Sequence, residues 1–322
     1  MSQPEQPGPR HPAGAGRRQA ATSRAILAAL LASPAAWGAE VTFRQTPGRT
    51  EVSIDGQPFT NLYYGSDRAK PFLHPLRTVS GKVVTRGFPV EKIEGESTDH
   101  IWHHGLWYGH GDINGVDFWR DRGPETTGRI VARGQPKISG DTLALDCELV
   151  APQKQILGTI LQRFRFARLD RNYRVDVEMV VGAGRGTALQ MGDTEEGALG
   201  FRFADKFRED RGGVLTNSDG LTGTRQIWGK RARWVDYSTT LQGQKVGVTI
   251  LDHPGNPKYP TYWHARGYGL NAANPFGEHD FHKDKTRDGS LTIPAGGTLT
   301  FRYGVVIHEG ELHPAEAERW AK

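Results

Sequence analysis

The chain has 322 residues, of which 36% are hydrophobic and 24% charged, and its formal net charge is +5 at pH 7. Four arginines and one glutamate lie in residues 1–38, so the remainder has a net charge of +2, which gives no reason to expect a nucleic-acid partner. The single cysteine, Cys147, excludes an internal disulfide and a thiolate metal site, and its alternating apolar surroundings predict a core residue.

The first 38 residues have the pattern of an export signal. Residues 1–24 are polar and basic, and they are followed by the apolar run AILAALLASPAAWGA and by small residues at Ala36 and Gly38. We predict that residues 1–38 are a signal peptide with an extended basic n-region and that the mature chain is periplasmic or secreted. The pair Arg17-Arg18 leaves twin-arginine export open. No later apolar run reaches half of the roughly 20 residues of a spanning helix, so we expect no transmembrane segment in the mature chain.

From residue 39 on, apolar and polar residues alternate with period two, which predicts β-strands. An opening hairpin over residues 40–59 comes first, and a meander of four strands separated by turn residues follows over 128–182. Further strands are expected at 187–192, 197–204, 231–241, 245–252 and 297–308. Only residues 313–322 have a helical pattern.

Antiparallel strands in this number must close into a barrel or stack in two layers. The 41 glycines and 19 prolines agree with a chain of many turns. We therefore predict that residues 39–322 form a single all-β domain, a large antiparallel β-sandwich with a short C-terminal helix. Two sheets of roughly six or more strands each are the expected arrangement.

One segment of the chain, DHIWHHGLWYGHGDINGVDFW at residues 99–119, collects unusual side chains. It holds His100, His103, His104 and His110 within eleven positions, where the average composition would give about 0.4 histidines. Histidine donates and accepts protons near neutral pH, and the flat tryptophan rings suit the C–H face of a sugar. This cluster predicts a functional site.

Three further segments carry similar side chains, and we expect all four to converge. They contain His74 and Lys82, then Glu195 and Glu196, and finally a region rich in aromatic and polar residues that includes His264. The predicted acid–base residues are His104, Glu195, His110 and His264, with His104 and Glu195 as the preferred pair. The predicted substrate contacts are His74, Lys82, His103, Trp107, Asn114, Asp117 and Asn274.

Several of these residues have a structural interpretation as well. Trp107 could fill the core, Asp117 could satisfy a turn backbone, and Glu195 and Glu196 could be a solvated pair. His308, in an alternating strand, is expected to be structural.

The segments HPLRTVSGKVVTRGFP, HHGLWYGHGDINGVDFW, GDTEEGALGFR, RARWVDYS and ILDHPGNPKYPTYWHARGYGLNAANPFGEHDF resemble a bacterial family of unknown function that carries the label "methane oxygenase PmoA". The resemblance covers most of the mature chain, and the expected fold is similar to the mutarotase-like β-sandwiches that handle carbohydrates. A subunit of the particulate methane monooxygenase would span a membrane many times, so we treat the label as a misannotation.

The resulting hypothesis is an enzyme that acts on a carbohydrate or related polyhydroxylated substrate, a small molecule or an oligosaccharide, without a tightly bound cofactor. A hydrolase, a lyase and an epimerase would all use such groups. Two alternatives stay open. One is a metal-dependent oxygenase or hydrolase in which His110 and Asp112, with His264 or His279, hold a divalent metal. The other is a non-catalytic sugar-binding module. The motifs of P-loop, dinucleotide-binding and α/β-hydrolase enzymes are absent from the sequence.

Overall fold

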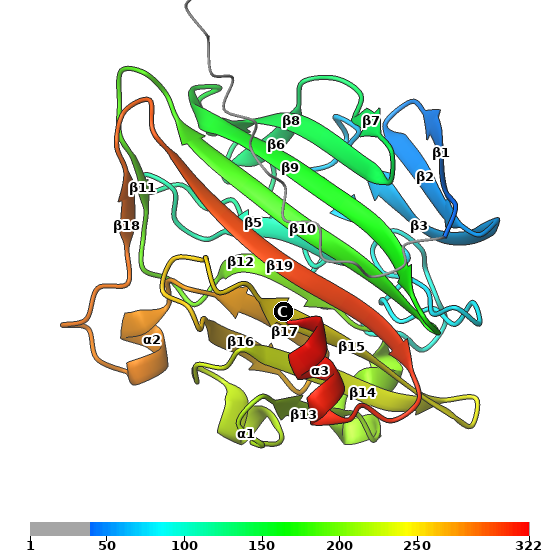
Figure 1. The fold of residues 1–322 in the computed structure, drawn as a ribbon. Helices are drawn as coiled ribbons and strands as arrows, with labels where there is room; N and C mark the ends of the chain where they lie inside the picture. Colours follow the sequence, from blue (N-terminus) through cyan, green and yellow to red (C-terminus); the bar gives the residue numbers. More distant parts are fainter. Residues whose placement is uncertain (1–38, 322) are drawn as a thin grey trace, which may run out of the picture. The chain divides into compact units, whose positions relative to one another are not determined.

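The computed structural model of the protein describes residues 39–321. The predicted signal peptide, residues 1–38, lies outside the described residues. The described chain is almost entirely β-structure (Figure 1). Its strands are β1 (Val41–Thr46), β2 (Arg49–Ile54), β3 (Gln57–Tyr63), β4 (Phe72–Leu73), β5 (Leu106–His110), β6 (Arg129–Ala132), β7 (Lys137–Ser139), β8 (Thr142–Val150), β9 (Ile156–Leu169), β10 (Asn172–Ala183), β11 (Leu189–Met191), β12 (Gly197–Arg202), β13 (Val214–Asn217), β14 (Trp234–Leu241), β15 (Gln244–Asp252), β16 (Tyr262–Arg266), β17 (Leu270–Asn274), β18 (Leu291–Ile293) and β19 (Thr298–Glu309).

Two large antiparallel sheets form the sandwich. The eight-stranded sheet has the order β1-β2-β3-β4-β5-β12-β17-β16, and the nine-stranded sheet has the order β13-β14-β15-β19-β10-β9-β8-β6, with β7 paired to β8. The short strands β11 and β18 pair separately. These sheets confirm the predicted all-β sandwich, and each exceeds the expected six strands.

The main core lies between the inner faces of the two sheets. Strand β8 shows the alternation that produces it, because Leu143, Leu145, Cys147 and Leu149 are buried while most of the residues between them are partly exposed. The opposite sheet contributes a cross-strand row of Tyr108, Leu199 and Ala273 to the same core. Cys147 is a core residue, as the sequence predicted.

A second apolar cluster covers the outer face of the eight-stranded sheet. It contains Phe72, Trp107, Trp119, Leu270 and Ala272, all at most 1% exposed. An antiparallel sheet commonly has one solvated face, so this burial means that loops cover part of the outer face. The charged residues described below lie beside this cluster.

The predicted C-terminal helix is present as α3 (Pro314–Trp320), and it packs on the nine-stranded sheet. Its Ala317 joins Trp234, Leu251 and Val306 in a third apolar cluster. The helices α1 (Thr224–Ile227) and α2 (Glu278–His282), and the 3-10 turns η1 (Asp205–Phe207) and η2 (Glu209–Arg211), lie in loops and have no counterpart among the predicted elements. They are one turn each, too short to produce a visible 3.6-residue period.

One predicted strand needs correction. Residues 128–138 were expected to form one strand, but they form β6 and β7, which both pair with β8. Gly134 interrupts the run with a positive φ of 148°, a backbone conformation that L side chains rarely adopt.

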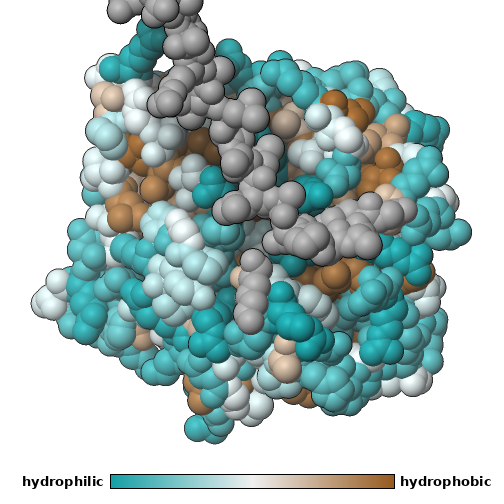
Figure 2. Space-filling view, in the orientation of Figure 1, coloured by the Kyte–Doolittle hydropathy of each residue, from teal (hydrophilic) through white to brown (hydrophobic). Residues whose placement is uncertain are grey.

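On the face of the protein shown in Figure 2, hydrophilic residues cover most of the visible described surface. Among the helices of residues 39–321, none combines the length and the apolar character that crossing a membrane requires.

Candidate active site

The outer face of the eight-stranded sheet brings together side chains from the segments that the sequence singled out. Strand pairing sets Trp107 of β5 opposite Gly200 of β12, Gly200 opposite Ala272 of β17, and Ala272 opposite His264 of β16. Gly200 is required here, because a Cβ atom at that position would lie 2.5 Å from the Trp107 ring. The strands therefore present Trp107 and His264 on one face, with small residues between them.

Four rings are stacked one on the next along this face. His103 lies between Trp107 and His100, with ring centroids 5.0 and 4.9 Å away, and His100 lies 5.0 Å from Tyr268. Trp119 packs against both Trp107 and His103. Much of the histidine-rich segment thus serves as flat aromatic surface, a use of imidazole that adds to its proton chemistry.

The buried part of this stack has polar atoms without partners. Both ring nitrogens of His103 and the indole nitrogens of Trp107 and Trp119 lack a hydrogen-bond partner within the described residues. Burial lowers the pKa of His103 well below its ordinary value, with the nearby Arg202 acting in the same direction, so its ring is neutral at physiological pH. A buried unpaired polar group costs about 1–3 kcal/mol. The two indole N–H groups and one nitrogen of the neutral His103 ring therefore call for an acceptor, and the other His103 nitrogen calls for a donor.

Glu196, Arg120 and Asp117 form the first of two charged groups at the edge of the stack. Its Oε1 accepts a hydrogen bond from Arg120 at 2.7 Å, and Arg120 also donates to Asp117 at 3.0 Å. Burial raises the pKa of Glu196 to about 7, an increase that Glu195 and Asp117 reinforce and that Arg120 opposes. Glu196 can therefore both donate and accept a proton near neutral pH.

Glu195 forms the second charged group, with Arg266 and His264. Its Oε2 lies 3.1 Å from Nη2 of Arg266 and 3.5 Å from Nδ1 of His264. Burial lowers the pKa of His264 to about 3, so the contact with Glu195 involves a neutral ring. Arg266 Nε donates to His264 Nε2 at 3.3 Å, which leaves the imidazole proton on Nδ1, the side facing Glu195. The half-buried Trp228 lies under the Arg266 guanidinium at 5.0 Å.

The two carboxylates have different surroundings although they are adjacent in sequence. Burial raises the pKa of both, and at each carboxyl group an arginine opposes the increase most, Arg266 at Glu195 and Arg120 at Glu196. Two carboxyl groups held by separate partners can take the acid and the base role of a proton-transfer reaction. Tyr268 and the buried Lys70 also lie within electrostatic range of Glu196.

The predicted pair of His104 and Glu195 is not formed in the described contacts. His104 stacks on Phe72 at 4.6 Å and donates through Nδ1 to the carbonyl of Trp102, whereas Glu195 contacts Arg266 and His264. Burial lowers the pKa of His104 to about 3. This ring is neutral and nine-tenths enclosed, which does not suit a residue that must exchange protons with a substrate.

His74 and His110 are also enclosed. Burial lowers the pKa of each to about 4. His110 packs 4.3 Å from Phe276 and donates to the carbonyl of Gly192 at 3.0 Å, which places it among core residues on the inner side of β5. His74 has no hydrogen-bond partner among the described residues, and its nearest carboxylate, on Glu91, is 3.9 Å away.

The alternative of a metal-dependent enzyme requires a cluster of metal ligands. Within residues 39–321, no group of three or more His, Cys, Asp or Glu side chains is arranged to hold a metal ion. His110 and Asp112, the expected ligand pair, make separate backbone contacts instead. His110 donates to the carbonyl of Gly192, and Asp112 accepts from the backbone N–H of Gly115 at 2.7 Å.

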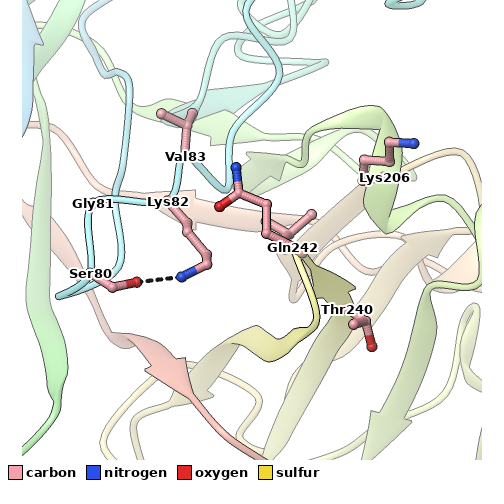
Figure 3. A pocket seen from close by; sticks show the side chains of 8 residues that line it. Ser80, Gly81, Lys82, Val83, Lys206, Thr240 and Gln242 are labelled. Atoms are coloured by element: carbon pink, nitrogen blue, oxygen red, sulfur yellow. Dashed lines mark hydrogen bonds between the residues drawn. The ribbon is translucent and has the colours of Figure 1, made fainter.

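Lys82 belongs to a different part of the molecule. It lines a surface hollow of about 550 Å³ with Lys206, Thr240 and Gln242. Figure 3 shows its ammonium group turned toward Ser80, which accepts its hydrogen bond at 2.7 Å. Lys82 also donates to Gln244 at 2.6 Å. The expectation that Lys82 joins the histidines therefore needs correction, because its loop contacts the β14–β15 turn.

The other predicted contacts position loops. Asn114 accepts a hydrogen bond from the backbone of Gln190, and Asn274 ties the backbone of Thr194 to that of Phe276. Asp117 accepts from the backbone of Trp119 and orients Arg120. The structural interpretation of Asp117 is thus confirmed, and Asn274 holds the segment that carries the two glutamates.

The sequence reasoning did not select Arg120, Arg202, Tyr268, Lys70 or the buried carboxyl of Glu196. A usable signal existed for Arg202 and Arg266, since each is a charged residue at an outer-face position of an otherwise apolar strand. The burial of Glu196 depends on loops far apart in the chain, and no local pattern reports it.

A family model described as a family of unknown function, DUF6807, matches residues 49–322. The chain belongs to the DUF6807 family. This agrees with the expected family of unknown function, while the methane-oxygenase label stays untested. A comparison with curated proteins gives no match.

Among solved structures, the fold is similar to a galactose mutarotase-like protein from Lactobacillus casei, at 8% identity and a TM-score of 0.36 over 83% of this chain and 100% of the other. A galactose mutarotase related enzyme from Lactobacillus acidophilus gives 8% identity and a TM-score of 0.34, covering 84% and 100% of the two chains. A galactose mutarotase-like protein from Clostridium acetobutylicum gives 8% and 0.36, covering 85% and 99%. Likeness at this level carries no argument about function.

Proposed function

We propose that this DUF6807 protein is an enzyme that acts on a carbohydrate or related polyhydroxylated substrate by acid–base chemistry on the outer face of the eight-stranded sheet. The observation that carries the proposal is the pair of adjacent carboxyl groups beside an aromatic wall, each held by its own arginine. We place the protein in the periplasm or outside the cell, on the strength of the signal-like first 38 residues alone.

In this proposal Glu196 is the general acid. Its carboxyl group is close to half protonated at neutral pH, and its exposed fraction of 16% leaves it open to a bound molecule. Arg120, fixed by Asp117, holds the carboxyl group in one orientation and stabilises the anion that remains after proton donation.

Glu195 is the complementary base. Arg266 favours its ionised form, and the Nδ1–H of His264 faces the same oxygen, Oε2. His264 is then a positioning residue, while His104 is assigned to packing. Proton abstraction by Glu195 and donation by Glu196 would serve a hydrolase, a lyase or an epimerase.

The stacked rings and unpartnered donors supply the binding surface. The partly buried Trp102 offers an apolar face, and the unpartnered nitrogens of the buried rings can hydrogen-bond to hydroxyl groups. This combination of flat apolar area and polar groups is what a sugar ring requires.

The test is a screen of neutral and acidic mono- and oligosaccharides, followed by proton NMR for any product. With a substrate in hand, Glu196→Gln should lower kcat by about 10²–10⁴-fold, as expected for loss of a general acid. The exposed Glu94→Gln is the matched control and should leave kcat unchanged. Saturable binding without product would instead identify a sugar-binding module, and full turnover by Glu196→Gln would refute the assigned role.

A further inference from the structure

One group on the outer face is left unexplained by the acid–base pair, namely the guanidinium of Arg202. Its side chain is fully buried at the end of β12. Nη2 donates to Asp99 at 2.7 Å and to Ser97 at 3.3 Å, but Nε and Nη1 have no hydrogen-bond partner within the described residues. Buried polar groups in proteins nearly always have partners, and exceptions indicate an absent ligand, ion or water.

Arg202 shares its ion-pair partner, Asp99, with a second arginine. The same oxygen, Asp99 Oδ1, receives Arg86 Nη1 at 2.5 Å as well as Arg202 Nη2 at 2.7 Å. One carboxylate thus serves two buried guanidinium groups. Arg86 fills its remaining donors with the carbonyls of Phe88 and His100, while Arg202 does not.

The surroundings of Arg202 contain further unpartnered donors. Arg202 lies close enough to His103 to lower the pKa of that ring, and His103 packs on Trp107 and Trp119, whose indole N–H groups are unpartnered. A ligand with several acceptor atoms and a negative charge would satisfy this set. The planar fork of arginine matches a carboxylate in particular.

A loop residue, Tyr268, packs over the guanidinium of Arg202. The ring of Tyr268 lies 4.8 Å from the guanidinium carbon, and Tyr268 is half-buried in the β16–β17 turn between Gly267 and Gly269. Gly269 has a positive φ of 95°.

We propose that Arg202 binds a carboxylate of the substrate, so that the site takes acidic sugars of the uronic-acid class. This proposal rests on the proposed function and narrows its substrate class. Tyr268 then acts as the cover that moves aside when the carboxylate enters, and the sugar ring extends from Arg202 toward Glu195 and Glu196.

Burial is the main cause that lowers the pKa of Arg202, to about 10, and the nearby Arg86 adds to it. An anion bound at Arg202 would raise this pKa again and so oppose both effects. The lowered pKa thus agrees with a missing anionic partner, for which the unpartnered Nε and Nη1 are the primary observation.

The experiment measures binding of four probes to the purified protein by calorimetry: glucuronate, galacturonate and the methyl ester of each acid. The neutral parent sugars serve as the reference. The esters keep the ring and remove the charge. We expect at least one acid to bind about tenfold or more tightly than its ester, the effect expected for a charged hydrogen-bonded pair. This comparison needs no variant and stands even if substitutions at Arg202 prevent folding.

Variants then assign the effect to a residue. Arg202→Lys should weaken binding of the acid at least about tenfold, because lysine keeps the charge but not the fork. Arg174→Gln is the matched control, since Arg174 is a partly buried arginine of the other sheet that donates to Asp176 and Trp320. It should leave binding unchanged.

The outcomes separate the two proposals. Equal affinity for acids, esters and neutral sugars would overturn the carboxylate site and leave the proposed function standing. Binding of acids that survives intact in Arg202→Lys would also overturn it. Failure of every sugar, charged or neutral, to bind or react would remove the proposed function and this proposal with it.

Discussion

Two buried polar clusters of this protein use histidine in opposite ways. In the nine-stranded sheet, His308 Nε2 and Thr249 Oγ1 both lie 2.9 Å from Asp236 Oδ1, under Trp320 of helix α3. On the outer face of the eight-stranded sheet, His103, Trp107, Trp119 and Arg202 are equally buried. The ring nitrogens of the first three and Nε and Nη1 of Arg202 lack partners among the described residues.

The difference separates a structural cluster from a candidate ligand site. A buried polar network in which each member has a partner rigidifies the fold, whereas unsatisfied groups lower stability. A protein keeps such groups where something else, such as a ligand, satisfies them. Hence the fold alone accounts for the His308 cluster, while the Arg202 cluster is the candidate ligand site.

The largest effect on stability is expected at the satisfied cluster. Asp236→Ala leaves His308 and Thr249 buried without their shared acceptor, so the free energy of unfolding should fall by about 3 kcal/mol. Urea unfolding measures this change. The exposed Asp210→Ala, 63% exposed, should stay within about 0.5 kcal/mol. Equal effects of the two variants would contradict the assignment of Asp236.

A pH-dependent effect is expected at Glu196. Its pKa in the folded protein is about 7, above its ordinary value of 4.5, so the folded state binds the extra proton and this contribution is lost as pH rises from 4.5 to 7. Glu196→Gln does not titrate. The variant should therefore gain stability relative to the native protein over this window, by at most about 3 kcal/mol.

Urea unfolding at pH 4.5 and pH 8 checks the Glu196 prediction. Buried histidines such as His264, whose folded pKa is about 3, change stability in the opposite direction, but they are present in both proteins. The comparison between the two proteins therefore isolates Glu196. A difference that is constant with pH would mean that its carboxyl group is not buried.

Replacing His103 and His308 by phenylalanine should change the free energy of unfolding in opposite directions. His103→Phe keeps the stacked ring and removes two unpartnered nitrogens, so stability should rise by about 1 kcal/mol, while acidic-sugar binding weakens. His308→Phe should lower stability, because Asp236 loses its partner. Thermal unfolding of both variants tests the comparison directly, and destabilisation of equal size would show that His103 is satisfied in solution.

The smallest effect is expected at Lys82. Its ammonium group contacts Ser80 and Gln244 near the surface, outside both clusters. Lys82→Ala should change stability by less than about 0.5 kcal/mol and leave sugar binding unchanged. A loss of binding comparable to that of Arg202→Lys would place the substrate in the hollow of Figure 3 instead.

The fold was largely predictable because strand alternation is a local property. Every expected strand from the opening hairpin to the last strand has a counterpart, and the C-terminal helix is present. Six short strands were not predicted, namely β4, β5, β13, β16, β17 and β18, and three of them, β5, β16 and β17, carry site residues. The exceptions are informative. Gly134 divides one predicted strand, and α1 and α2 are single turns set by loop packing.

The sequence predicted which segments of the chain form the candidate site better than it predicted which residues of those segments face it. Four segments were expected to converge, and those around His103, Glu195 and His264 do meet on one face, whereas Lys82 of the fourth lies at the β14–β15 turn. Composition could not tell which histidine faces the core, as His110 does, because that depends on strand register. Nor could it separate Glu195 from Glu196, whose different surroundings come from Arg266 and Arg120, residues distant in sequence.

The most direct test of a ligand site at the unsatisfied cluster follows the indole N–H signals of the tryptophans by two-dimensional NMR during addition of glucuronate. Trp107 and Trp119 have unpartnered indole nitrogens, whereas Trp234 donates to Glu318 and Trp263 to the carbonyl of Ala232. We expect the Trp107 and Trp119 signals to shift while those of Trp234 and Trp263 stay unchanged. Binding of glucuronate that leaves Trp107 and Trp119 unmoved would contradict it.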